Sequence, residues 1–318
     1  MHRKILVITL SNIGDAILTT PVVQALRKNF PDAAIDILAG PRAAEVFKGD
    51  PRVHKTIVYD KHQSLAEKIK LIKRLRENHY HTAIDLRNTL IPLLIGVKHR
   101  TPLFFRKPRG VFYKKDAHLF RLKQAGVDIA GAELDIWISA QDQLYIDSLL
   151  ADTGKNFIAV APGARSDTKR WSEEKFTSLC EKFTRLNIPL ALTGDGADEK
   201  IAQFIVERIN SAKILNLCGR TTLAQLAALL KRSKVLISND SAVMHIAAAV
   251  KTPVVAIFGP TNPGKYAPRG EKDIIIRKDI PCSPCERAQC QRTHQCLEKI
   301  GVEEVYNAAK KIYENTCN

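Results

Sequence analysis

Short apolar runs alternate along the chain with longer segments in which apolar residues recur every three or four positions. Runs such as Ile5 to Leu10 and Ile35 to Ala39 contain little polar alternation, which is typical of parallel strands buried on both faces. The segment from Ser64 to Asn78 has helical spacing instead. Its predicted core face consists of Leu65, Ile69, Ile72 and Leu75. Strands and helices in alternation predict an α/β protein with doubly wound parallel sheets.

This alternation occurs twice, which indicates two Rossmann-like domains facing a cleft. The first series includes predicted strands at Thr56 to Tyr59 and Ala83 to Leu86, and the pattern weakens between Asp116 and Gly154. The second series has predicted strands at Phe157 to Ala161, Leu190 to Thr193, Ile214 to Leu217, Val235 to Ile237 and Val254 to Phe258. We therefore expect one domain over residues 1–153 and a second over residues 154–318. The last predicted helix, Val302 to Tyr313, is expected to pack back on the first domain.

Several helix boundaries have recognisable chemistry. An early helix should reach about Asn29, and Pro21 either kinks it or starts a second piece after Thr20. Ser172 is a predicted N-cap, with two glutamates in the turn that follows. Thr222 with Gln225 forms a predicted capping box.

The stretch from Lys234 to Pro260, KVLISNDSAVMHIAAAVKTPVVAIFGP, predicts a strand, a polar turn, a short helix, a second strand and a glycine turn. A helix that starts at the carboxyl end of a parallel strand is suited to holding phosphate. Asp240 would repel a diphosphate there, so it either caps the helix or faces a sugar hydroxyl while neighbouring N–H groups hold the phosphate. His245 lies one helical turn after Ser241, on the same face.

The composition indicates a globular protein of about two domains, since 45% of the 318 residues are hydrophobic and 26% are charged. The start, MHRKILVITL, resembles a signal peptide, but its apolar run is short and Asn12 interrupts it soon after. No segment approaches the length of a membrane span. These features predict a cytoplasmic protein.

The formal net charge of +16 predicts an anionic partner. The sequence lacks helix-turn-helix and zinc-finger spacing, so a nucleic acid is not expected. Basic residues gather between Lys98 and Lys115, interleaved with Phe104, Phe105, Phe112 and Tyr113. This segment is either a membrane-interface loop or a solvated basic loop whose aromatic residues pack on the domain.

Two turns carry side chains suited to group transfer. Asp15 follows the first strand and could accept a proton as a general base, although a helix N-cap is the alternative. Lys169 and Arg170 follow a strand and a glycine turn in the second domain, where they are either cations for a leaving diphosphate or a solvated pair. Trp171 is more typical of a packing residue. Candidates for binding acceptor carboxylates or phosphates are Arg87, Arg100 and Arg109.

Four stretches of the sequence resemble the heptosyltransferases of glycosyltransferase family 9, which have the GT-B fold. They are ILVITLSNIGDAILTTPVVQALRKNFP, PGARSDTKRWSEEKF, the region from LTGDGADEK through SNDSAVMHIAAA, and TPVVAIFGPTNPGKYAP. The Asn-Asp-Ser-x-x-x-His turn followed by the FGPT loop is the most specific of these matches. Together the stretches span nearly the whole chain.

The resemblance implies an inverting transfer of heptose from ADP-heptose to the inner core of lipopolysaccharide, an anionic glycolipid, at the inner face of the cytoplasmic membrane. It implies no tightly bound cofactor or metal. By motif, Asp15 matches the general base, near the acceptor-side residues Asn12 and Gly14. The implied donor-site residues are Gly163, Arg165, Lys169, Gly194, Asn239, Asp240, Ser241, His245, Gly259 and Thr261. The chain has Ala242 where many members have glycine, which leaves the exact donor open.

The cysteines allow a second interpretation. Cys282, Cys285, Cys290 and Cys296 give the spacing C-x2-C-x4-C-x5-C, which could hold a structural metal, although it matches no standard zinc or ferredoxin pattern. Reduced or opportunistically paired thiols are the favoured interpretation. Cys180 and Cys218 lie in apolar stretches and are predicted to be buried, whereas Cys317 at the tail is predicted to be free.

Two alternatives to the heptosyltransferase hypothesis remain open at this point. Another GT-B enzyme, such as a nucleotide-sugar epimerase or a transferase for a different sugar, would share the fold and the phosphate loops. A non-catalytic nucleotide- or metal-binding module would depend on the cysteine segment instead.

Overall fold

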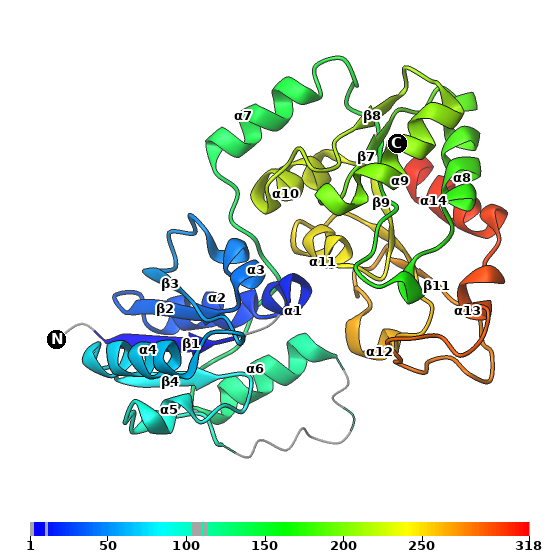
Figure 1. The fold of residues 1–318 in the computed structure, drawn as a ribbon. Helices are drawn as coiled ribbons and strands as arrows, with labels where there is room; N and C mark the ends of the chain where they lie inside the picture. The colour runs from blue at the N-terminus through cyan, green and yellow to red at the C-terminus, as the bar shows by residue number, and fades with distance from the viewer. Residues whose placement is uncertain (1–2, 10–11, 104–109, 111–112, 318) are drawn as a thin grey trace. The chain divides into compact units, whose positions relative to one another are not determined.

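The chain forms two compact units, Met1–Trp137 and Ile138–Asn318, each built on one parallel sheet (Figure 1). The computed structural model describes residues 3–9, 12–103, 110 and 113–317. The units divide earlier than the expected boundary after residue 153, because helix α7 (Ala140–Leu149) packs on α10 (Leu223–Arg232) in the second unit. An ion pair of 2.6 Å between Asp147 and Arg232 fixes that contact.

The first unit contains a five-stranded parallel sheet in the order β3-β2-β1-β4-β5. Its strands are β1 (Lys4–Ile8), β2 (Ala34–Ala39), β3 (Lys55–Val58), β4 (Thr82–Asp85) and β5 (His99–Arg100). The central strand β1 is almost wholly apolar and buried, as the sequence predicts for a strand covered on both faces. In the register, Ile8 lies opposite Leu38 of β2 and Asp85 of β4, so their carboxyl ends form one edge.

Helices connect these strands. They are α1 (Ile13–Ile17), α2 (Thr20–Asn29), α3 (Pro41–Ala44) with a 3-10 turn η1 (Glu45–Phe47), α4 (Leu65–Glu77), α5 (Ile91–Leu94) and α6 (Lys114–Gln124). Pro21 lies in the first turn of α2, which confirms that a second helix starts near Thr20. Helix α6 begins just before the region where the sequence pattern weakens and was not predicted.

The predicted core face of α4 is wrong in part. Leu71 and Leu75 are the buried residues of this helix, whereas Leu65 is 74% exposed and Ile69 is 61% exposed. Ser64 and Glu67 form a capping box that fixes the start of the helix. The helix therefore carries two apolar stripes, of which only one covers the sheet.

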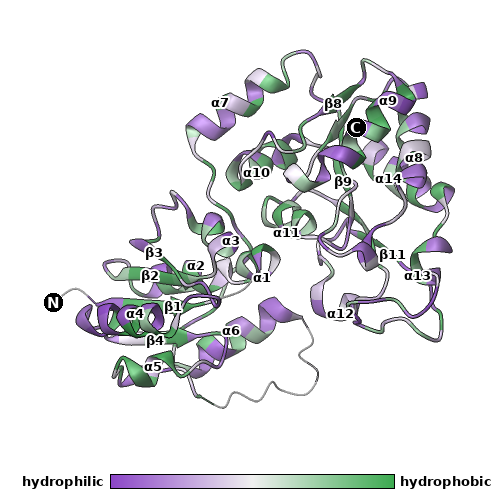
Figure 2. Cartoon of the chain, viewed as in Figure 1, coloured by the Kyte–Doolittle hydropathy of each residue, from purple (hydrophilic) through white to green (hydrophobic). Residues whose placement is uncertain are grey.

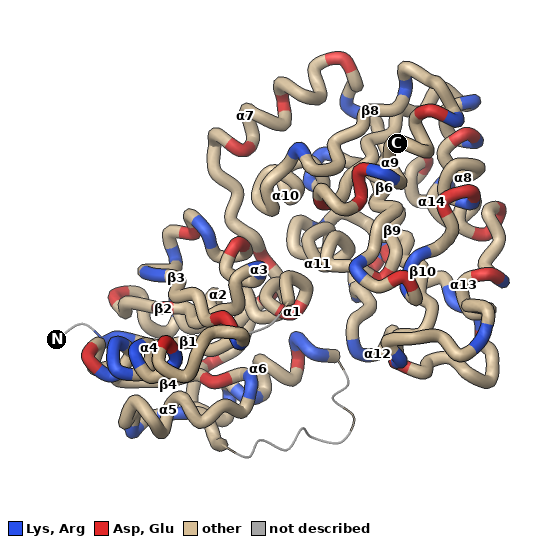
Figure 3. Tube along the Cα trace, viewed as in Figure 1, with Lys and Arg blue, Asp and Glu red and all other residues tan. Residues whose placement is uncertain are grey.

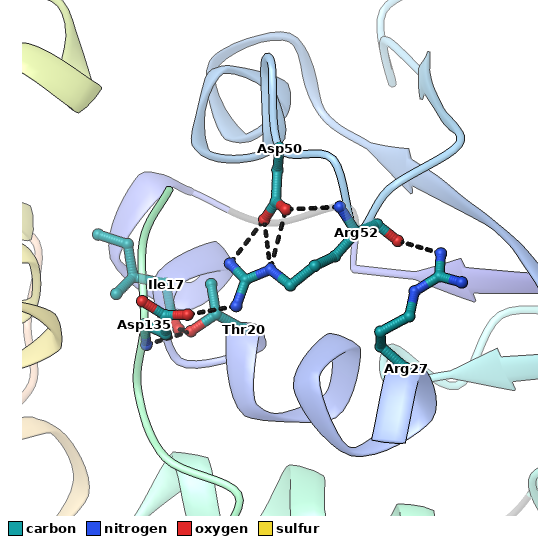
Figure 4. A network of polar contacts seen from close by, with 6 residues as sticks. All are labelled: Ile17, Thr20, Arg27, Asp50, Arg52 and Asp135. Atoms are coloured by element: carbon teal, nitrogen blue, oxygen red, sulfur yellow. Dashed lines mark hydrogen bonds and ion pairs between the residues drawn. The ribbon is translucent and has the colours of Figure 1, made fainter. Parts of the chain in front are cut away.

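A network of charged side chains holds the segment that leaves the first unit (Figure 4). Arg52 makes an ion pair of 2.7 Å with Asp50 and a second ion pair with Asp135. The Asp135 N–H also donates to Thr20 Oγ1 at 3.1 Å, and the Thr20 hydroxyl donates to the Ile17 carbonyl at 2.8 Å. This network fixes the departing segment to the junction between α1 and α2.

The second unit contains a six-stranded parallel sheet in the order β11-β10-β9-β6-β7-β8. Its strands are β6 (Ile158–Ala161), β7 (Leu190–Leu192), β8 (Ile214–Asn216), β9 (Val235–Asn239), β10 (Val254–Ile257) and β11 (Ile274–Ile276). Strands β6, β9 and β10 are buried along their whole length. Figure 2 shows the hydrophobic residues of this sheet within their covering of helices.

The helices of the second unit have the expected caps. Ser172 caps α8 (Glu173–Arg185), and Thr222 with Gln225 forms the predicted capping box of α10. The remaining helical segments are η2 (Asp167–Lys169), η3 (Gly196–Asp198), α9 (Glu199–Ile209), α11 (Ala242–Ala249), α12 (Pro263–Tyr266), α13 (Gln295–Glu298) and α14 (Val302–Cys317). Contrary to expectation, α14 packs within the second unit, where Val305 and Ala309 join its core.

None of the described helices is both long and apolar enough to cross a membrane.

Candidate functional site

The carboxyl edge of the second sheet carries the predicted polar turn. Strand β9 ends at Asn239, and Ser241 is the N-cap of α11, accepting a hydrogen bond from the Val243 N–H at 3.3 Å. The N-cap interpretation of Asp240 is therefore wrong, because the next residue performs that role. The Asp240 carboxylate does not cap α11, so it is available for another contact beside the start of that helix.

Asp240 forms an ion pair with Lys169. The Lys169 ammonium lies 2.6 Å from Asp240 Oδ2, and the Asp240 side chain is only 6% exposed, whereas that of Lys169 is 33% exposed. Lys169 ends η2, the short turn that follows β6, so the two charges come from neighbouring strands. A solvated Lys169 is thereby excluded. The pair holds a one-third-exposed cation at the edge of the sheet where α11 starts.

The Asn239 side chain holds the loop that carries Lys169 through hydrogen bonds to both ends of that loop. Its side-chain amide donates to the Pro162 carbonyl at 2.7 Å, and its Oδ1 accepts from the Trp171 N–H at 3.0 Å. Trp171 is buried, and its indole N–H donates to the Ile300 carbonyl at 3.1 Å. Asn239 thus joins the two ends of the loop that carries Lys169, and Trp171 is a packing residue as predicted.

At three of the predicted donor-site glycines, an added Cβ would meet a neighbouring side chain. A Cβ on Gly163 would lie 1.9 Å from Asp198 Oδ1, and one on Gly194 would lie 2.5 Å from Asp198 Oδ2. A Cβ on Gly259 would lie 2.8 Å from Leu297 Cγ. Real Cβ contacts of this length do not occur, so these positions accept no side chain without a shift of their neighbours.

The remaining predicted donor-side residues lie on the same turns. His245 is buried within α11, one turn beyond Ser241, and Thr261 is buried in the turn after β10. Arg165 is exposed in the loop that leads from β6 to η2. All of these residues belong to the second unit.

The carboxyl edge of the first sheet carries Asp15, in the first turn of α1. Asp15 is not the N-cap, since Asn12 occupies that position. Its Oδ1 forms an ion pair with the Lys114 ammonium, and its Oδ2 lies 3.8 Å from the Arg87 guanidinium. The Asp15 side chain is 17% exposed, so a partly buried carboxylate lies between two cations.

The backbone is held in place at both Arg87 and Lys114. The buried Asp85, which ends β4, accepts the Arg87 N–H at 2.8 Å and the Thr89 N–H at 2.6 Å. Lys114 is the first residue of α6, and one turn later the buried His118 packs against α1. The ends of β1 and β4 and the start of α6 therefore converge on Asp15.

His118 joins α6 to the helix of Asp15. Its Nδ1 lies 3.3 Å from the Leu18 carbonyl and 3.4 Å from Thr19 Oγ1, and the Thr19 hydroxyl donates to the Asp15 carbonyl at 3.0 Å. Burial and the charge of Lys114 lower the pKa of His118 to about 4. The imidazole is therefore neutral at pH 7, and it supports the site without adding charge.

The positions of the other predicted acceptor-side residues add little to the description of the site. Gly14 lies within α1 beside Asp15, and Arg100 at the end of β5 donates to the Val97 carbonyl at 2.8 Å. Arg109, Phe104, Phe105 and Phe112 lie outside the described residues. Tyr113 is buried, so this aromatic residue packs on the unit and is not exposed as a membrane-interface residue would be.

Sequence reasoning missed Lys114, Asp85 and His118 as parts of this site. Lys114 stood within the basic stretch, but 99 residues separate it from Asp15. A buried aspartate at the end of a strand was a usable signal for Asp85. No local pattern marked His118, because its contacts are made across the fold.

The cysteine segment is folded against the second unit. Cys282 and Cys296 pack at the core of that unit, whereas Cys285 and Cys290 are exposed. Among the described residues, no group of three or more His, Cys, Asp or Glu side chains is arranged to hold a metal ion. Cys180 and Cys218 are buried as predicted, and burial raises the pKa of each thiol to about 12.

The two parallel sheets and their helices define an α/β protein with the GT-B fold of glycosyltransferases. A protein of glycosyltransferase family 9 from Veillonella parvula has a TM-score of 0.87, with 25% sequence identity and 98% of each chain covered. The Escherichia coli ADP-heptose lipopolysaccharide heptosyltransferase II has a TM-score of 0.81, with 24% identity, 99% of this chain and 100% of that chain covered.

The sequence places the chain more narrowly. The family model for glycosyltransferase family 9 (heptosyltransferase) matches residues 110–295. Lipopolysaccharide heptosyltransferase 3 of Escherichia coli K12 is 28% identical, with 94% of this chain and 95% of that protein covered. The chain belongs to glycosyltransferase family 9, the heptosyltransferases, and is a glycosyltransferase. Family membership sets aside the non-catalytic alternative.

Proposed function

We propose that this enzyme transfers heptose from ADP-heptose to the inner core of lipopolysaccharide with inversion of the anomeric centre. The observation that carries the proposal is Asp15, a partly buried carboxylate at the carboxyl edge of the first sheet, with the cations of Lys114 and Arg87 beside it. The relatives support the substrates, since their names specify lipopolysaccharide and, for one structure, ADP-heptose.

In the proposed reaction, an acceptor hydroxyl attacks the anomeric carbon of the donor. The new C–O bond forms as the bond to the diphosphate oxygen breaks, and the hydroxyl proton passes to the Asp15 carboxylate. Positioned acid–base help of this kind is worth about 10²–10⁴-fold in rate. Inversion follows because the attack is a single displacement.

The second unit would bind the donor. Lys169 and the N-terminus of α11 bring positive charge to the edge where we place the leaving diphosphate. Asp240 would repel a phosphate in direct contact, so we assign it to a donor hydroxyl, while Lys169 uses another of its three N–H groups for the phosphate.

The first unit would bind the acceptor. The inner core is anionic, and Arg87 and Lys114 are suited to its carboxylates or phosphates. Because the acceptor is a glycolipid, we expect the enzyme to work at the cytoplasmic face of the inner membrane. We propose that it needs no tightly bound cofactor and does not act on nucleic acid.

The test is to replace Asp15 with asparagine, which keeps the shape of the side chain and removes the base. We expect transfer to fall by about 10²–10⁴-fold. Binding of ADP, measured by calorimetry, should stay within about twofold, since the change lies in the other unit from the proposed donor site.

The matched control is Asp32→Asn, which makes the same change at an exposed turn of the same unit. It should leave transfer unaltered. Transfer by the Asp15 variant within a few-fold of wild type would remove Asp15 from the role of base. Binding of UDP or GDP in preference to ADP would overturn the donor.

A further inference from the structure

The first unit exposes leucines on and beside the short helix α5, which follows the loop that carries Arg87. Leu90 is 63% exposed, Leu93 is 43% exposed and Leu94 is 53% exposed, on and beside α5. The inward residues Ile91 and Ile95 belong to the core. The exposed leucines are therefore not needed to hold the helix on the sheet.

Helix α4 contacts α5 and adds more exposed apolar surface. Leu65 and Ile69, one turn apart, form the exposed stripe that the sequence assigned to the core. We define the α4–α5 surface by its exposed apolar residues, which are Leu65, Ile69, Leu90, Leu93 and Leu94. A cluster of large exposed aliphatic side chains marks an interaction surface more often than scattered single residues do.

The charge around this surface is strongly positive. Helix α4 carries five Lys or Arg residues against two Glu, and the exposed Lys98 follows α5 after a short turn. Figure 3 shows basic residues along α4, and Figure 2 shows the hydrophobic colour of α5. Apolar side chains with basic residues beside them are the combination that binds anionic lipid surfaces.

The position of the surface matches a lipid-linked substrate. Leu90 follows Arg87 by three residues, and Arg87 lies beside Asp15. In chain order α4 follows β3 and α5 follows β4, so both helices start from the side of the sheet where these strands end. An acceptor whose lipid stays in the bilayer would have to reach Asp15 from the membrane, so a docking surface next to Arg87 shortens that reach.

We propose that the α4–α5 surface docks the enzyme on an anionic lipid bilayer, with its leucines and Ile69 entering the interface and its lysines and arginines contacting acidic headgroups. The membrane location rests on the proposed function, and the present proposal names the residues that bind the membrane. A second copy of the chain fits less well, because two such surfaces would bring like charges together.

The experiment is sedimentation of the full chain with vesicles of phosphatidylethanolamine and phosphatidylglycerol, compared with vesicles of phosphatidylcholine alone. The test variant is Leu93→Ser with Leu94→Ser. The matched control is Leu144→Ser with Leu186→Ser, since these leucines are also exposed but belong to the second unit. Transfer to a water-soluble acceptor saccharide is measured in parallel.

We expect wild type and control to bind the anionic vesicles and the test variant to bind about tenfold or more weakly, because two leucines are lost from the interface. Lys98→Glu and an increase in salt should also weaken binding. Equal binding by test variant and wild type, or equal binding to phosphatidylcholine, would overturn the proposal.

The parallel assay separates the two proposals. Soluble transfer by the test variant should stay near the wild-type rate. Vesicle binding that depends on Leu93 and Leu94 supports the surface even if the protein transfers no heptose, a result that would count against the proposed function alone. Transfer at the wild-type rate with no vesicle binding would overturn the surface and leave the function.

Discussion

Replacing Lys169 with methionine tests the ion pair at the centre of the donor edge. Methionine keeps much of the length of the side chain and removes its charge, so the buried Asp240 carboxylate loses its partner at 2.6 Å. Removing one partner of a fully buried pair costs about 3–5 kcal/mol. Lys169 is one-third exposed, which lets water reach the vacated space, so we expect about 2 kcal/mol.

The assay is urea unfolding followed by tryptophan fluorescence. The chain has two tryptophans, and Trp137 ends the first unit while Trp171 is buried in the second, two residues from Lys169. In a Trp137→Phe background, the signal therefore reports on the second unit. With a slope of about 2 kcal/mol per molar, the loss of stability moves the midpoint down by about 1 M urea.

A double variant separates charge from packing. Adding Asp240→Asn to Lys169→Met removes the unpaired charge, so the midpoint should return most of the way to wild type. Transfer should not recover, since the proposed phosphate contact is still absent. A single variant that unfolds at the wild-type midpoint, or a double variant as unstable as the single, would refute the reasoning.

Further expectations concern packing, pH and thiol chemistry. Gly259→Ala should cost about 1–3 kcal/mol, because its Cβ would meet Leu297 Cγ at 2.8 Å, and Leu297→Ala should relieve the strain measured by urea unfolding. Because the pKa of His118 is lowered in the folded protein, the unfolded chain takes up this proton at a higher pH than the folded chain, and stability falls as the pH falls. Wild type should thus lose on the order of 2 kcal/mol more than His118→Gln between pH 7 and pH 5, measured by unfolding at both values. The high pKa and burial of Cys180 predict that iodoacetamide modifies the exposed Cys285 first, as peptide mapping would reveal. Faster labelling of Cys180 would contradict its burial.

The sequence was sufficient to predict nine of the eleven strands among the described residues, because buried parallel strands are apolar without interruption, whereas β5 and β11 were not predicted. The predicted runs at Phe157 to Ala161 and Val254 to Phe258 became β6 and β10 with ends shifted by one residue. The same logic placed Asp15 and Asp240 at the carboxyl edges of their sheets. The GT-B fold followed from the two series of strands and from the family resemblance.

Side-chain direction was harder to predict. On α4, Leu65 and Ile69 have the same helical spacing as a core stripe, and only the packing of Leu71 and Leu75 decides which stripe is buried. The expected domain boundary, after residue 153, also differs from the division of the structure after Trp137. Helix α7 has a weak apolar pattern of its own, and it joins the second unit through contacts that no local sequence reveals.

The partners of the candidate base were also beyond local reasoning. Lys114 reaches Asp15 only because α6 returns to the sheet edge, where His118 fixes it on α1. In the same way, the role of Asp240 depended on Lys169, 71 residues away, because the pair is made only when β6 and β9 lie side by side. Nothing near Asp240 in the sequence distinguishes an N-cap from a member of an ion pair.

The most direct measurement is the anomeric configuration of the product. The purified enzyme would be supplied with ADP-heptose and with two inner-core acceptors, one that lacks heptose and one that already carries a first heptose, and the product would be analysed by nuclear magnetic resonance. We predict a heptosylated acceptor with the configuration opposite to that of the donor, formed by wild type and not by Asp15→Asn. A product with retained configuration, or transfer only from a UDP- or GDP-linked sugar, would contradict the proposal.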